Sequence, residues 1–91
     1  MYTLKPTRRF EKDVKRISKR GYNIDLLAEA IKKLANGEVL DESYRDHPLK
    51  GIYIGCRECH ITTDWLLIYE LADDTLILYL TRTGTHSDLL E

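Results

Sequence analysis

Two strongly apolar runs lie close together in the sequence, separated by a short polar turn. The runs cover residues 65–71 (WLLIYEL) and 75–81 (TLILYLT), with Ala72-Asp73-Asp74 between them. Aromatic and branched residues favour strands, and so short a connection joins antiparallel neighbours. Neither run alternates strictly between polar and apolar residues, which is typical of central strands that are covered on at least one face. The C-terminal half is therefore expected to form the middle of an antiparallel sheet.

The N-terminal half has the period of helices instead. Thr7 and Asn23 are suited to cap two successive helices, and Gly21 and Gly37 are suited to end them. The two apolar stripes consist of Phe10, Val14 and Ile17, and of Ile24, Leu27, Ile31 and Leu34. Because only a few residues separate the helices, they are expected to form an antiparallel hairpin.

The remaining segments complete a predicted order of β-α-α-β-β-β. Residues 2–5 can form a short edge strand before Pro6, and residues 57–61 can form a strand before a turn at residues 62–64. Residues 38–51 are expected to be a loop, and residues 87–91 a short tail. This order predicts an α+β fold with a mainly antiparallel sheet and both helices on one face, in a single domain over residues 1–91.

Composition limits the protein class. With 43% hydrophobic and 32% charged residues, the 91-residue chain is typical of a small soluble domain. No apolar run approaches the ~18 residues of a membrane span, and residues 1–6 do not resemble a secretion signal. We expect a cytoplasmic protein with reduced thiols and no membrane partner.

Positive charge is concentrated near the N-terminus, although the formal net charge is −1. Eight of the sixteen residues from Lys5 to Arg20 are basic, and only Glu11 and Asp13 oppose them. A basic helix face is the usual footprint of a polyanion partner, although a solvated helix face or an acidic protein partner would also account for it. The candidate RNA-binding residues are Lys12, Lys15, Arg16, Lys19 and Arg20.

The chain has three histidines, His47, His60 and His86, and each lies in a polar stretch outside the helical patterns. Asp46 and Asp64 accompany the first two, and Arg82 accompanies the third. Histidine can give and take a proton near neutral pH, and arginine can bind phosphate through two nitrogens. This set suits acid–base chemistry on a phosphate ester, although periodicity does not show that the three stretches converge.

Cys56-Arg57-Glu58-Cys59-His60 has the spacing of a c-type haem attachment site. No export signal precedes it, and Met1, the only methionine, is poorly placed to be an axial ligand. Zinc binding or redox chemistry of the two thiols is a further alternative, but cysteines three apart on a strand point to opposite faces. Two small, partly buried thiols are the favoured interpretation, with no metal or cofactor.

Four motifs together resemble the YafQ branch of the RelE/ParE toxin superfamily. They are Tyr44-Arg45-Asp46-His47-Pro48-Leu49-Lys50-Gly51, Arg57-Glu58-Cys59-His60, Asp64-Trp65-Leu66-Leu67-Ile68-Tyr69 and Arg82-Thr83-Gly84-Thr85-His86. The resemblance covers nearly the whole chain. It implies a bacterial type II toxin, a ribosome-dependent endoribonuclease that cuts mRNA in the A site, together with a cognate antitoxin. A non-catalytic module of this fold, such as an inactive toxin or a gyrase-type effector, is the alternative.

The resemblance also implies site residues. The expected catalytic residues are His47, His60, Asp64, Arg82 and His86, and the expected substrate-binding residues are Trp65, Lys50, Thr83 and Thr85. We expect His86 to act as the general acid, Asp64 and His60 to form the base pair, and Arg82 to hold the phosphate. His47 would position the phosphate or share the base role. Members of the family carry an aromatic residue near the C-terminus, where this chain has Leu89 and Leu90, so Trp65 or a tyrosine is the expected stacking residue.

Overall fold

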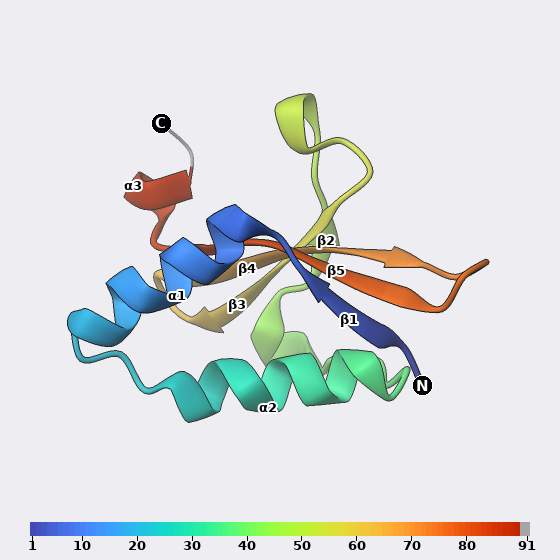
Figure 1. Ribbon diagram of the computed structural model, residues 1–91, viewed down its shortest axis with the longest axis horizontal. Helices are drawn as coiled ribbons and strands as arrows, with labels where there is room; N and C mark the ends of the chain where they lie inside the picture. Colours follow the sequence, from blue (N-terminus) through green and yellow to red (C-terminus); the bar gives the residue numbers. More distant parts are fainter. Residues whose placement is uncertain (90–91) are drawn as a thin grey trace.

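A computed structural model describes residues 1–89, and Leu90 and Glu91 lie outside the described residues. Five strands form one sheet in the order β1-β5-β4-β3-β2 (Figure 1). The three long strands are β3 (Arg57–Thr62), β4 (Trp65–Ala72) and β5 (Ile77–Gly84), and neighbours among them are antiparallel. The predicted α+β class and the mainly antiparallel sheet are therefore confirmed.

The two outer strands differ in origin. The strand β1 (Thr3–Pro6) pairs in parallel with β5, as the predicted edge strand near the N-terminus. The strand β2 (His47–Pro48) lies within the segment expected to be a loop, and it pairs with β3 through Glu58 and Arg57. The short helical turns η1 (Glu42–Tyr44) and η2 (Gly51–Tyr53) flank it. Elements this short have no periodicity of their own, so the sequence did not predict them.

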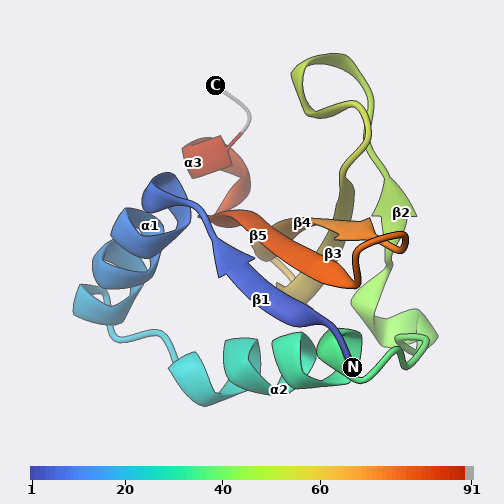
Figure 2. The same ribbon diagram turned by 45° about the vertical axis from the view of Figure 1, so that its right-hand side comes forward.

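The helices α1 (Arg8–Lys19) and α2 (Ile24–Ala35) begin after the predicted caps. The Thr7 hydroxyl accepts the backbone N–H of Phe10, and the Asn23 side chain accepts that of Asp25. The helices open away from each other from their connecting turn (Figures 1 and 2). Both contribute to the main hydrophobic core on one face of the sheet, hereafter the helix face. Within residues 1–89, none of the helices has the length and apolar character needed to cross a bilayer.

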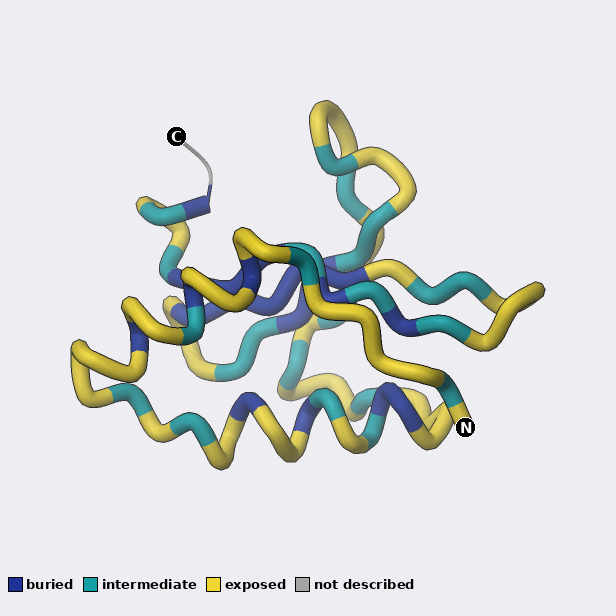
Figure 3. Tube along the Cα trace, viewed as in Figure 1, coloured by how far each residue is buried: buried dark blue, intermediate teal, exposed yellow. Residues whose placement is uncertain are grey.

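The opposite face of the sheet, hereafter the histidine face, carries a smaller apolar cluster. Leu66 and Ile68 of β4 pack there against Leu89 and the segment 49–56. Leu89 belongs to a third helix, α3 (His86–Leu89), where the sequence predicted a tail. Figure 1 shows α3 and the loop containing η2 rising on the same side of the sheet, and Figure 3 shows the buried residues gathered in the central strands and on the inner sides of the helices.

The end of β5 differs from the expectation that strand structure would stop at Thr81. The strand continues to Gly84 because Arg82, Thr83 and Gly84 pair with β4. Its start is also later, at Ile77, because residues 73–76 form the turn and Leu76 adopts a positive φ of 53°. The longer strand brings Arg82 and Thr83 inside the sheet and delivers the chain directly into α3.

Candidate active site

The three histidines come together in a row at one end of the sheet. The ring centroids of His47 and His60 are 6.3 Å apart, and those of His60 and His86 are 5.8 Å apart. His60 lies on the histidine face because it pairs directly with Leu66, and His47 lies there because it pairs with Glu58. Side chains from β2, β3 and α3, which are distant in the sequence, thus form one imidazole cluster.

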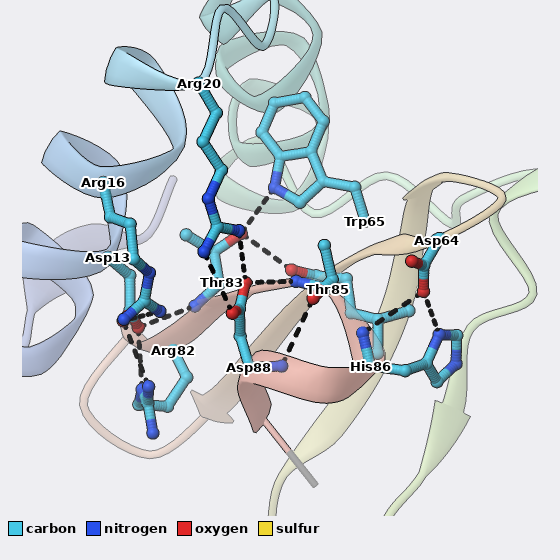
Figure 4. A network of polar contacts seen from close by, with 11 residues as sticks. Asp13, Arg16, Arg20, Asp64, Trp65, Arg82, Thr83, Thr85, His86 and Asp88 are labelled. Atoms are coloured by element: carbon cyan, nitrogen blue, oxygen red, sulfur yellow. Dashed lines mark hydrogen bonds and ion pairs between the residues drawn. The ribbon is translucent and has the colours of Figure 1, made fainter.

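His86 is held by Asp64, which lies in the turn between β3 and β4. One carboxylate oxygen, Oδ1, is 2.5 Å from His86 Nδ1 and 3.2 Å from the His86 backbone nitrogen (Figure 4). These hydrogen bonds lower the pKa of Asp64 below its usual value, and the one from the imidazole has the larger effect. An ionised carboxylate at Nδ1 orients the imidazole and leaves Nε2 for chemistry. The structure therefore pairs Asp64 with His86, whereas the sequence-based mechanism pairs it with His60.

The short helix α3 is anchored so that His86 stays next to Asp64. The backbone N–H of Thr85 donates to the Asp88 carboxylate at 3.0 Å, and the backbone N–H of Asp88 donates to the Thr85 hydroxyl at 3.2 Å. This reciprocal pattern is a capping box. Arg20, which follows the last residue of α1, donates to the same Asp88 carboxylate at 2.9 Å. A side chain at Gly84 would come within 2.9 Å of Asp88 Cβ. Thr85 therefore helps to position His86.

His47 is held at both ring nitrogens. Its Nδ1 is 2.7 Å from the Arg45 carbonyl oxygen, and its Nε2 is 3.2 Å from Oε1 of Glu58. Arg45 has a φ of 49°, in the left-handed region, which turns its carbonyl toward the ring. The neighbouring Asp46 points to the helix face, where it accepts hydrogen bonds from Arg57 Nε and the Tyr69 hydroxyl. Because side chains alternate along extended backbone, anchoring Asp46 leaves His47 on the histidine face.

Arg82 lies on the histidine face, in register with Ile68 and Glu58. Its side chain is nevertheless buried, and it binds Asp13 of α1 through Nε at 2.7 Å and Nη2 at 3.1 Å. The hydrogen bond to Asp13 is the main reason that the pKa of Arg82 is raised. Arg82 is therefore on the same side of the sheet as the histidines, but part of its guanidinium is already bound to Asp13.

Trp65 and Thr83 do not lie where the sequence-based site requires them. Trp65 is 1% exposed, and its indole N–H donates to the Thr83 hydroxyl at 2.9 Å. Thr83 is fully buried, and its own hydroxyl donates to the Leu66 carbonyl. Neither side chain can reach a substrate, because both belong to the helix-covered core. Their burial therefore contradicts the expectation that the Trp65 and Thr83 side chains bind substrate.

Comparison with known proteins assigns the family. The family model described as "Bacterial toxin of type II toxin-antitoxin system, YafQ" matches residues 2–91. The chain is 41% identical over 81 residues to the mRNA interferase toxin YafQ of Escherichia coli K12. The aligned region covers 88% of this chain and 86% of that protein. The chain belongs to the YafQ family of type II toxins.

Solved structures agree with this assignment. YafQ from Escherichia coli BL21(DE3) superposes with a TM-score of 0.93 at 35% identity, and the match covers all of both chains. The Escherichia coli DinJ–YafQ complex gives a TM-score of 0.91 at 36% identity, again over all of both chains. A metal-bound toxin from Helicobacter pylori gives a TM-score of 0.91 at 39% identity over 98% of this chain and 99% of that one. The fold predicted from the YafQ resemblance is thus confirmed.

The predicted RNA-binding residues of this YafQ-family chain divide into two groups. Arg16 and Arg20 form ion pairs with Asp13 and Asp88, so their charges are partly neutralised within the fold. Lys12, Lys15 and Lys19 are exposed on α1, and their spacing places them on one side of the helix. Lys50 is exposed at the start of η2, in the loop that borders the histidine face. These four lysines remain candidates for RNA contact.

The two cysteines face different environments. Cys59 is fully buried in the core of the helix face, whereas Cys56 packs against the apolar cluster of the histidine face. Burial raises the pKa of the Cys59 thiol to about 12, which removes it as a nucleophile near neutral pH. Because the thiols lie on opposite faces, they cannot bind one metal ion together. Across residues 1–89, no group of three or more potential side-chain ligands is arranged to hold a metal.

Sequence reasoning missed three acidic residues that support the site. Glu58 lies two residues before His60 in a strand, and this alternation could have placed it on the same face. Asp13 lies between Phe10 and Ile17 on the buried side of α1, where an unpaired charge would be costly. Asp88 follows Thr85 at the spacing of a capping box, which was a readable signal for α3.

Proposed function

We propose that this YafQ-family endoribonuclease toxin cleaves messenger RNA in the ribosomal A site through the 2′-hydroxyl group. The observation that carries the proposal is the row of three imidazoles with Asp64 bound to His86. RNA supplies its own nucleophile, so the protein must provide a base, an acid and positive charge near the phosphate. Histidine side chains suit the first two tasks because they exchange protons near neutral pH.

His86 acts as the general acid in this proposal. The ionised Asp64 fixes Nδ1–H and stabilises the imidazolium form, so Nε2–H can protonate the departing 5′-oxygen. The imidazole of His86 and the carboxylate of Asp64 remain accessible, since their side chains are 46% and 66% exposed. An acid that must meet a large RNA substrate requires this exposure.

His60 acts as the base, at the centre of the row. Among the side-chain hydrogen bonds found within residues 1–89, none involves its imidazole, so a ring nitrogen can accept the 2′-hydroxyl proton. The 2′-oxygen then bonds to phosphorus as the bond to the 5′-oxygen breaks. His47 lies on one side of His60, and His86, the general acid, lies on the other. This arrangement suits a phosphate that spans the three imidazole rings.

Arg82 is proposed to contribute positive charge to the phosphate from the same face of the sheet. Asp13 occupies Nε and part of Nη2, so only the rest of the guanidinium is left for a phosphate oxygen. Lys50 and the three exposed lysines of α1 are proposed to bind RNA backbone outside the cluster. The cognate antitoxin is a further proposed partner, since the similar Escherichia coli toxin is seen in complex with DinJ.

The experiment measures cleavage of message on programmed ribosomes by primer extension, with wild type and with His60→Ala and His86→Ala. Each substitution should lower the cleavage rate by about 10²–10⁴-fold, the usual contribution of a placed acid or base. Ser87→Ala, an exposed neighbour on α3, is the matched control and should cleave normally. Wild-type binding to ribosomes without cleavage would instead favour a non-catalytic module.

A further inference from the structure

Glu58 is a buried carboxylate next to the histidine row. The residue is 5% exposed, and its Oε1 lies 3.2 Å from His47 Nε2. The other oxygen, Oε2, is buried and has no hydrogen-bond partner in the described part of the chain. A carboxylate in such a place is costly unless its one partner carries a positive charge. The partner available to Glu58 is the imidazole of His47.

The hydrogen bonds of His47 determine how many hydrogens its ring carries. Nδ1 faces the carbonyl oxygen of Arg45 at 2.7 Å, and a carbonyl can only accept. Nε2 faces Glu58, and an ionised carboxylate can only accept as well. With acceptors at both nitrogens, the ring satisfies its surroundings as an imidazolium. In that form His47 has no lone pair with which to take a proton from RNA.

The surroundings of His47 leave Glu58 as its counter-ion. From β3, Glu58 and the ring of His60 face it. On its own segment, Asp46 is turned to Arg57 and Tyr69 on the other face, and Arg45 contributes its carbonyl. No second carboxylate is therefore needed to explain the arrangement.

We propose that Glu58 is a positioning residue that keeps His47 as an imidazolium beside His60. His47 then acts as a fixed positive charge for the phosphate and not as the general base. The role of that charge in RNA cleavage rests on the proposed function, whereas the protonation of His47 does not. A fixed cation is valuable here because Asp13 already neutralises much of the charge of Arg82.

The first test is a nitrogen-15 NMR spectrum of the histidine rings in the free protein at pH 7.5. In wild type, both His47 nitrogens should show protonated shifts, and in Glu58→Gln the ring should become neutral. Glu70→Gln, an exposed carboxylate on β4, is the matched control and should leave His47 unchanged. A neutral His47 ring in the wild-type spectrum overturns the proposal, even if Glu58→Gln fails to fold.

The second test is a double-mutant cycle on ribosome-dependent cleavage with Glu58→Gln, His47→Gln and the double variant. Glu58→Gln should lower the rate roughly 10- to 100-fold at pH 8. The double variant should cleave no more slowly than His47→Gln, because Glu58 acts through that ring.

The outcomes separate the two proposals. Additive losses would show that Glu58 acts independently of His47 and would overturn the inference. If wild type itself cleaves no message, the proposed function fails while the NMR spectrum still decides the protonation of His47.

Discussion

At the residue scale, the contact between Asp64 and His86 is the most specific chemical feature of the site. Asp64→Asn keeps the size of the side chain but removes the charge that stabilises the His86 imidazolium, so cleavage should fall about 10- to 100-fold, less than for His86→Ala. Primer extension measures the loss, and Asp74→Asn in the exposed turn between β4 and β5 is the control. If Asp64→Asn still slows cleavage tenfold in a His86→Ala background, the carboxylate has a separate role.

Some site residues could be identified from the sequence and others could not, and the difference is whether the residue stands in a polar stretch or in a buried part of a strand. The three histidines were identifiable because they are few and stand in polar stretches. Trp65 and Thr83 were misplaced because each lies in a strand, where a shift of one position moves a side chain to the other face. Their two motifs placed both residues near the site along the chain, but the register of the strands turns both side chains into the core.

At the element scale, α3 depends on an acidic residue that responds to pH. The hydrogen bond from Arg20 holds the pKa of Asp88 well below its usual value of 3.8. A carboxylate whose pKa is lowered by folding stabilises the fold at pH values above its unfolded-state pKa. This stabilisation is lost as the pH falls toward the native-state pKa of the carboxylate. Wild type should therefore lose thermal stability between pH 5 and pH 2 more steeply than Asp88→Asn. Parallel curves for the two proteins would show that the anchor of α3 contributes nothing measurable to the titration.

Apart from β1, which has four residues and was predicted as an edge strand, the elements divide by length into those that the sequence predicts and those that it does not. The helices α1 and α2 and the strands β3, β4 and β5 were predicted because each is long enough to show a period. The strand β2 spans His47–Pro48 and α3 spans His86–Leu89, so neither shows one. Each of these two short elements carries a histidine of the row. The chemistry was therefore visible in the sequence, while the geometry that unites it was not.

At the scale of the whole molecule, Asp13 joins the helix α1 to the sheet. Its carboxylate accepts from Arg82, from Arg16 and from the backbone N–H of Thr83, and the side chain is 3% exposed. Asp13→Asn leaves the charge of Arg82 buried without its partner, which should lower the free energy of unfolding by about 3–5 kcal/mol. Urea denaturation measures this loss, with Glu11→Gln on the exposed side of α1 as the control. A loss below about 1 kcal/mol would mean that the pair does not tie the two layers together.

The distribution of charge over the whole molecule explains how a chain of net charge −1 could approach RNA. Arg16 and Arg20 are committed to carboxylates, whereas Lys12, Lys15 and Lys19 remain exposed on α1. If these lysines bind RNA phosphates, each Lys→Gln change should weaken ribosome binding and reduce the slope of log affinity against log salt by about 0.7–0.9. Binding measured across a salt series tests this, with the exposed Lys32→Gln of α2 as the control. A triple variant with an unchanged slope would place the RNA contact elsewhere and leave the basic side of α1 to the solvent or to an acidic protein partner.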